Sequence, residues 1–176
     1  MQPAARAGDI ELLYFDEAGF SCLPNVQRSW SPLGKPHTAD ASVGRKRANV
    51  LGALNYATKH LDFHVCEHSV RRDDVIAFLD RVAEASNSAK FTFIVMDNAS
   101  IHHHIEPAII ERWLVKNRFA PLYLPPYSPE LNLIEILWKN AKYHWRVFTS
   151  WTRESLMREV TDLIGGFGTK FHIDYA

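Results

Sequence analysis

Three acidic residues occupy positions at which a folded chain can gather catalytic groups. Asp16 and Asp97 each end an apolar run typical of a strand, and Glu135 lies in the first turn of an expected helix after a proline-rich loop. Such groups collect at the carboxyl edge of an α/β sheet, so the three side chains are expected to converge there. Acids at strand ends are also common turn residues, and the spacing alone leaves that structural interpretation open.

Converging carboxylates repel one another and are costly unless a cation lies among them. Their hard oxygen atoms suit Mg²⁺ or Mn²⁺ better than zinc. Two such ions about 3.5–4 Å apart can activate an attacking oxygen and stabilise a leaving oxygen in phosphodiester displacement. The chemistry that these residue types favour is therefore metal-dependent cleavage of a phosphodiester.

The elements that must position these acids follow an α/β pattern. Apolar runs predict strands over residues 10–15, 49–56, 61–67, 91–96 and 119–124. Helical spacing predicts helices over about 72–85, from 107 onward, over about 131–145 and over about 152–164. This order indicates a mixed central sheet of about five strands with helices on both faces. Residues 17–46, rich in glycine and proline, are expected to form turns and a short hairpin around Trp30.

Length and composition indicate one globular domain. The chain has 176 residues, of which 47% are hydrophobic and 23% charged. We expect the domain to span residues 10–165, with tails at residues 1–9 and 166–176. The longest apolar runs are too short to cross a bilayer, and no signal-peptide pattern opens the chain. A cytoplasmic protein is therefore expected.

The charge balance does not by itself indicate a nucleic-acid-binding protein. Twenty basic and twenty acidic residues cancel, and the strongly basic balance typical of such proteins is absent. Two segments, 25–50 and 139–158, each carry five basic residues against one acidic residue. They fit a local DNA-facing surface and equally fit solvated loop and helix faces.

Three motifs carry a family resemblance. They are DEAGF at Asp16–Phe20, DNASIHH at Asp97–His103 and LPPYSPELNLIE at Leu124–Glu135. Together they resemble the catalytic domain of bacterial insertion-sequence transposases of the mariner superfamily, a group of DDE transposases. The resemblance covers about residues 12–159 and implies an RNase H-like fold similar to that of retroviral integrase. Leu133 departs from the family pattern, which usually has proline there.

The resemblance implies a site and a reaction. Asp16, Asp97 and Glu135 are expected to be the catalytic metal ligands, with Asp16 bridging two Mg²⁺ or Mn²⁺ ions and the other two acids each holding one. Water is then expected to cut DNA at the element ends, and the freed 3′-hydroxyl to attack target DNA at a TA step. The implied enzyme is a two-metal endonuclease and strand transferase, and its implied partners are transposon-end DNA, target DNA and a second copy of the chain.

Residues beside the three acids are expected to support them. Asn98 and His102 are expected to orient a ligand or contact phosphate, although Asn98 also fits a turn and His102 a hydrogen-bonded position beyond the strand. Glu17 points away from Asp16 if the strand continues, which favours a supporting role.

Two lysines follow Glu135 on its expected helix. Lys142 lies seven residues after Glu135 and therefore on the same helix face, so it is a better candidate for a phosphate contact than Lys139. A solvated lysine is the alternative for both.

Two histidine-rich patterns are candidates for zinc sites, but both are weaker than the acids as metal-binding patterns. Consecutive residues such as His102–His104 cannot all point at one ion. His60, His64, Cys66 and His68 share one strand face at a period of two, where a polar sheet face is the more common explanation.

The position of the acids in the chain bears on the function. Full-length relatives carry a helix-turn-helix DNA-binding region before the catalytic domain, whereas fifteen residues precede Asp16 here. That region is expected to be missing or separately encoded, and the domain to bind DNA weakly and without sequence preference. Two alternatives stay open: an RNase H-like nuclease or resolvase, and a non-catalytic remnant that serves as a DNA-binding or oligomerising module.

Overall fold

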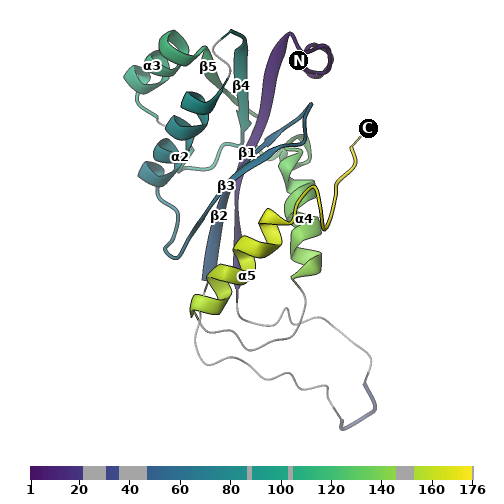
Figure 1. The fold of residues 1–176 in the computed structure, drawn as a ribbon. Helices are drawn as coiled ribbons and strands as arrows, with labels where there is room; N and C mark the ends of the chain where they lie inside the picture. The colour runs from purple at the N-terminus through teal and green to yellow at the C-terminus, as the bar shows by residue number, and fades with distance from the viewer. Residues whose placement is uncertain (22–30, 36–46, 87–88, 103–104, 146–152, 176) are drawn as a thin grey trace.

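The computed structural model describes residues 1–21, 31–35, 47–86, 89–102, 105–145 and 153–175 as three layers, a central sheet between two layers of helices (Figure 1). The expected hairpin around Trp30 lies outside the described residues. Within the described ranges, no helix combines the length and apolar character needed to cross a bilayer.

The sheet has the strand order β3-β2-β1-β4-β5. Its strands are β1 (Ile10–Ser21), β2 (Arg47–Asn55), β3 (Leu61–Cys66), β4 (Phe91–Met96) and β5 (Phe119–Tyr123). Antiparallel pairs join β1 to β2 and β2 to β3, whereas β1, β4 and β5 pair in parallel. The parallel strands are separated in the chain by helices, as crossover connections require. The expected mixed sheet of five strands is confirmed.

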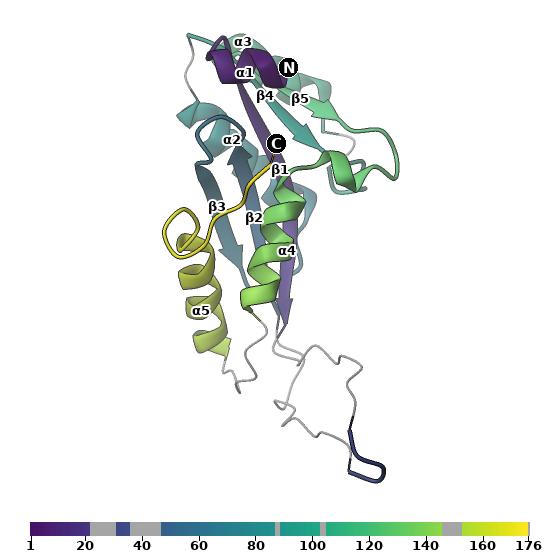
Figure 2. The same cartoon turned by 90° about the vertical axis from the view of Figure 1, so that its right-hand side faces the viewer.

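Helices cover both faces of the sheet. Their bounds are α1 (Gln2–Ala7), α2 (Arg72–Ala85), α3 (Pro107–Asn117), the 3₁₀ turn η1 (Pro129–Leu131), α4 (Ile134–His144) and α5 (Arg153–Gly165). Helices α2 and α3 lie on one side, and α4 and α5 lie on the other (Figures 1 and 2). Each layer has its own apolar core, because the sheet separates the two.

The alternation along β1 assigns its side chains to the two layers. Leu13 and Phe15 belong to the core beneath α2 and α3, whereas Leu12 and Tyr14 belong to the core beneath α4 and α5. Successive residues of a strand point to opposite faces, so Asp16 follows Tyr14 toward the α4 layer. Glu17 follows Phe15 toward the other.

The structure corrects the expected end of the first strand. The strand does not stop at Asp16 but runs five residues further to Ser21. The physical reason is that Ala18 and Phe20 are buried in the α4 layer and the whole extension pairs with β2, out to Ser21 opposite Arg47. Asp16 is therefore a mid-strand residue.

The two expected tails also differ from the structure. Residues 2–7 form α1, in which Ala5 is buried and Gln2 donates a hydrogen bond to the Tyr14 hydroxyl over 3.2 Å. At the other end, Phe171 and Ile173 are buried in the α4 layer. Both ends of the chain thus contribute to the core.

The start of α2 generates a testable prediction. The Asp74 carboxylate accepts a 2.8 Å hydrogen bond from the Arg71 backbone N–H, and this bond, followed by that of His68, holds the pKa of Asp74 below its ordinary value. Asp74→Ala is expected to lower the free energy of unfolding by about 1 kcal/mol at neutral pH, because the backbone N–H of the N-cap residue Arg71 loses its acceptor.

The pH dependence gives the check, by urea denaturation. A lowered carboxyl pKa stabilises the fold above the unfolded value of 3.8, and this stabilisation is lost as pH falls through the folded pKa. The two unfolding curves should therefore converge in acid. Asp73→Ala, at the exposed neighbouring position, is the matched control, and an equal loss in that variant would contradict the capping role.

Candidate active site

Asp16 lies at the centre of the sheet, between the strands that carry its neighbours. It pairs with Gly52 of β2, and its residue is 8% exposed. In the parallel register of β1 and β4, Tyr14 pairs with Val95, so Asp97, the first residue after β4, comes beside Asp16. The topology therefore brings the two aspartates to one place, as expected, although Asp16 is not at a strand end.

The electrostatics of Asp16 bring Glu135 into the same group. Burial, the largest cause, raises the pKa of Asp16 to about 8. The negative charges of Glu17, Glu135 and Asp97 raise it further, with Glu17 contributing most and Asp97 least. Glu135 lies in the first turn of α4 and is exposed. Segments far apart in sequence, namely β1, the end of β4 and the start of α4, thus place their carboxylates close enough to disfavour ionisation of Asp16.

On the other side of the sheet, His102 joins two acids. Its ring is fully buried and packs edge-on against the ring of Phe15, with 5.2 Å between the ring centroids. Nδ1 contacts the Asp97 carboxylate, and Nε2 lies 2.7 Å from Oε2 of Glu17. Burial is the largest single influence and lowers the pKa of His102, but the two carboxylates outweigh it and raise the pKa to about 9. A protonated ring, donating from both nitrogens, fits this position.

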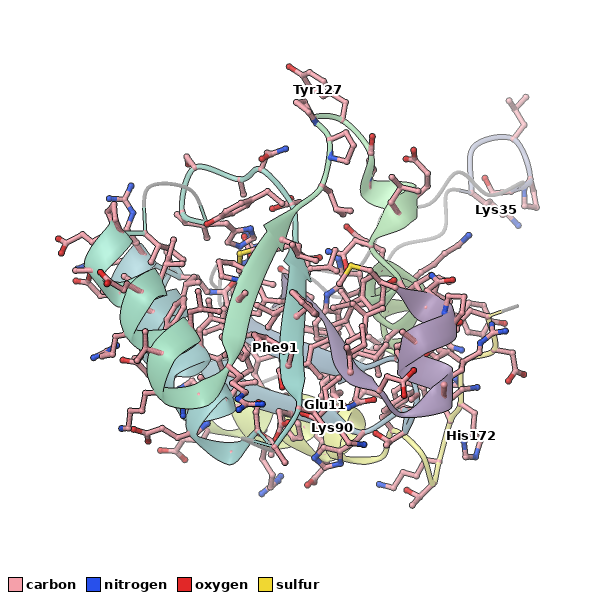
Figure 3. All side chains as sticks on the ribbon, turned by 90° about the horizontal axis from the view of Figure 1, so that it is seen from above. Glu11, Lys35, Lys90, Phe91, Tyr127 and His172 are labelled. Carbon is pink, nitrogen blue, oxygen red and sulfur yellow. The ribbon has the colours of Figure 1, made fainter. Side chains whose placement is uncertain are left out.

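The proline-rich segment between β5 and α4 stands beyond the sheet edge. Tyr127 lies at its tip, fully exposed and with a positive φ of 57° (Figure 3). The segment is attached at both ends: Asn98 donates a hydrogen bond from Nδ2 to the Leu124 carbonyl, and Asn132 donates one from Nδ2 to the Phe15 carbonyl over 2.9 Å. Asn132 has no chemical signal in the sequence beyond its position three residues before Glu135.

The donor set around Asp16 fits a divalent cation by its chemistry. Asp16, Asp97 and Glu135 offer carboxylate oxygens, the ligands that Mg²⁺ and Mn²⁺ prefer. As the side chains are placed, no three or more acidic, histidine or cysteine residues of the described part of the chain form a group that could hold an ion. Asp97 contacts His102 through Oδ1, and its side chain is 44% exposed; the Glu135 side chain is exposed as well.

The remaining expected site residues are placed as follows. Lys139 and Lys142 are exposed on α4, whose buried face is formed by other residues. Of the basic segment at residues 25–50, most lies outside the described residues. Leu133 has φ −63°, the value that a proline ring would impose at this position. The preceding residue, Asn132, is extended, as the residue before a proline usually is. The leucine therefore preserves the same helix start.

The two zinc hypotheses find no support in the described residues. Of the histidine tract, His102 is occupied by two carboxylates, and His103 and His104 lie outside the described residues. On β3, the side chain of His64 is exposed whereas Cys66 is buried, and the His68 ring turns to Asp74 at 3.1 Å. These side chains do not gather into a ligand group.

Comparison with known proteins gives a family and a fold. The sequence profile of a family described as DDE superfamily endonuclease matches residues 11–157. The insertion element IS630 uncharacterized 39 kDa protein of Shigella sonnei is 27% identical over 129 residues, which are 73% of this chain and 36% of that protein. The chain thus spans about a third of the length of this curated relative.

Solved structures share the fold. The Mos1 mariner paired end complex with Mn has a TM-score of 0.67 at 15% identity, over 88% of this chain and 48% of that chain. The pre-cleavage Mos1 transpososome has a TM-score of 0.65 at 15% identity, over the same shares of the two chains. The expected RNase H-like fold is confirmed by these likenesses and by the strand order.

The burial of Asp16 among other acids predicts that Asp16→Asn stabilises the metal-free protein. The pKa of Asp16 is about 8 in the folded state and about 3.8 in the unfolded state. Between about pH 4 and pH 8 the folded protein therefore binds a proton that the unfolded chain has lost. Stability of the parent chain should therefore fall as pH rises from about 4 to about 8. At pH 8 the amide variant should gain on the order of a few kcal/mol.

Thermal unfolding in the presence of a chelator, from pH 5 to pH 8, measures this difference. Glu111→Gln, at an exposed position of α3, serves as the control for removing one negative charge. A difference between Asp16→Asn and the parent that stays constant with pH would contradict the raised pKa.

Proposed function

The chain belongs to the DDE superfamily endonuclease family, and from that premise we propose that it is the catalytic domain of an insertion-sequence transposase. It cuts DNA at transposon ends and joins the freed 3′-hydroxyl to target DNA. Residues 10–165 carry its sheet and main helices, and buried residues of α1 and of the segment after α5 complete its core. The DNA-binding region that reads the transposon ends is assigned to a further segment or a separate chain. Because its proposed substrate is bacterial DNA, the protein is proposed to act in the cytoplasm.

The observation that carries the proposal is the convergence of three carboxylates: buried Asp16 in mid-β1, Asp97 at the end of neighbouring β4, and Glu135 in the first turn of α4. An arrangement that disfavours its own ionisation is stabilised when a cation enters it. We assign Asp16, Asp97 and Glu135 as the ligands of two Mg²⁺ or Mn²⁺ ions, with Asp16 shared between them. Divalent metal use is supported by the family and by the Mos1 complexes, which were obtained with Mn and with Mg. Bound there, the ions supply Lewis-acid stabilisation of the attacking and leaving oxygens.

The residues of this chain hold that site in place. His102, anchored to Glu17 beneath the sheet, fixes the direction of the Asp97 carboxylate from behind. Asn98 binds the Leu124 carbonyl and so ties the end of β4 to the loop that leads to Glu135. Both residues therefore act through the acids and not on DNA.

DNA approaches along the exposed face of α4. Lys139 and Lys142 follow Glu135 by four and seven residues, so the three side chains line one stripe of the helix. A phosphate bound by this stripe lies beside the proposed metal site. The homodimer on DNA implied by the resemblance completes the proposal, because one catalytic domain acts at each transposon end.

The test of the proposed activity is nicking of supercoiled plasmid DNA with Mn²⁺. Asp97→Asn and Glu135→Gln are each expected to reduce the nicking rate by about 100-fold or more, since the ions stabilise several kcal/mol of transition-state charge. Asp162→Asn, at an exposed position of α5, is the matched control and should nick like the parent.

Substrate choice then separates the alternatives. Joining of a 3′-hydroxyl DNA end to plasmid supports the transposase. Preferential cleavage of an RNA–DNA hybrid would favour an RNase H-like nuclease instead. A parent chain that neither binds Mn²⁺ nor nicks DNA would leave the non-catalytic module as the function.

The α4 stripe generates a separate prediction on DNA affinity. Lys142→Ala is expected to weaken binding of duplex DNA equally for all sequences and to reduce the slope of log affinity against log salt by about 1. Lys116→Ala is the control, because this exposed lysine lies in the last turn of α3 and is paired with Glu84 at 3.6 Å. Equal salt slopes for the Lys142 variant and the parent would exclude a phosphate contact there.

A further inference from the structure

The distance between Asp16 and Glu135 depends on how closely α4 approaches the sheet. Asp16 belongs to β1, whereas Glu135 is carried by α4, and no sequence-local element joins them. Gly52 of β2 pairs with Asp16 and lies directly under α4. A Cβ atom on Gly52 would come within 2.8 Å of Cη2 and Cζ2 of Trp138 and within 3.2 Å of Cδ1 of Ile134. The helix therefore rests on bare backbone beside Asp16.

The close approach has an unfavourable consequence. Trp138 is 1% exposed, and its Nε1–H has no hydrogen-bond partner in the described structure. A buried donor without an acceptor is costly, and natural cores rarely contain one. Helix packing alone would be satisfied by a phenylalanine and an ordinary strand residue at these two positions, so the tryptophan–glycine pair indicates a second requirement at this contact.

A second contact fixes the start of the same helix. Asn132 is 2% exposed and donates from Nδ2 to the carbonyl of Phe15, the residue before Asp16, over 2.9 Å. The carbonyl of Asn132 in turn accepts the backbone N–H of Glu135 over 3.0 Å. Two hydrogen bonds thus connect the backbone next to Asp16 with the backbone of Glu135.

We propose that Gly52 and Asn132 are positioning residues that hold α4 against β1 and β2 and thereby set the separation of Asp16 and Glu135 needed for both to bind the same divalent ion. The inference rests on the proposed function of these acids as metal ligands. Neither residue offers a carboxylate, and both act through α4. The ligands of such a site must be held within about 0.5 Å of their productive positions. A Cβ on Gly52 would lie only 2.8 Å from Trp138, so α4 or its side chains would have to move away from the sheet.

The test measures Mn²⁺ affinity by calorimetry and metal-free thermal stability for each variant. Gly52→Ala is expected to weaken Mn²⁺ binding about tenfold or more, the usual scale for residues that orient metal ligands. Asn132→Ala removes atoms and creates no clash, so it folds and is expected to show a similar loss. It keeps the test decisive if Gly52→Ala does not fold.

Two further variants separate positioning from general loss of stability. Trp138→Phe removes Cη2 and Cζ2, so in the Gly52→Ala background it is expected to restore Mn²⁺ affinity to within about twofold of Trp138→Phe alone. Val160→Ala creates a cavity in the same core layer on α5. It is expected to lower the melting temperature without changing Mn²⁺ affinity.

The outcomes distinguish the two proposals. Mn²⁺ binding by the parent chain with undiminished affinity in both Gly52→Ala and Asn132→Ala overturns the positioning role and leaves the metal site standing. An equal loss of affinity in Val160→Ala also overturns it, because stability alone would then account for the effect. No Mn²⁺ binding by the parent chain overturns the proposed metal site and this inference with it.

Discussion

The burial of Asp16 beside other acidic side chains is the constraint on which the remaining features of the structure depend. A carboxylate in the central strand lowers stability, and the nearby charges of Glu17, Glu135 and Asp97 lower it further. The fold tolerates this because β1 is paired on both sides and lies between two apolar layers. A rigid scaffold that holds an unfavourable group is typical of functional sites, where stability is given up for chemistry.

The alternation of β1 divides the acids into two groups with different fates. The His102 ring lies between two of these acids in the α2 and α3 layer. It contacts Asp97 through Nδ1 and Glu17 through Nε2, so its positive charge is shared by both carboxylates. Asp16 faces the opposite layer, where Glu135 adds negative charge and no cationic side chain is recorded as a partner among the described residues. The protein thus neutralises one side of its acidic group internally. The other side, which carries Asp16, is where the proposed function places a divalent ion.

Much of the fold was predictable from local sequence patterns, because strands and helices with strong periodicity form where their apolar residues recur. The order of elements and the two buried apolar runs before Asp16 and Asp97 were sufficient for the mixed sheet. The extension of β1 was missed since two consecutive acids interrupt its apolar alternation. Helix α1 and the C-terminal segment were missed because each contributes only one or two buried side chains, such as Ala5 and Ile173.

The site was predictable only in part, for a related reason. Asp16, Asp97 and Glu135 could be picked out in the sequence because each follows an apolar run or a proline-rich loop and lies in one of the three motifs. Their role as metal ligands stays a prediction. Gly52 and Asn132 carry no chemical signal, because their roles consist of a missing side chain and a satisfied carbonyl in the folded state. Such roles depend on which elements become neighbours, and that information exists only in the tertiary structure.

Helix α4 combines these requirements in one element. Its inner face carries Trp138 and its first turn carries Glu135, so the packing that fixes the helix also fixes a proposed ligand. Its outer face carries Lys139 and Lys142, which are free of the core and available to phosphate. DNA bound by the proposed Lys139 and Lys142 stripe would contact the same helix that carries Glu135. Binding of DNA and binding of the ion are therefore expected to be coupled through α4, with Gly52 setting the limit of its approach to Asp16.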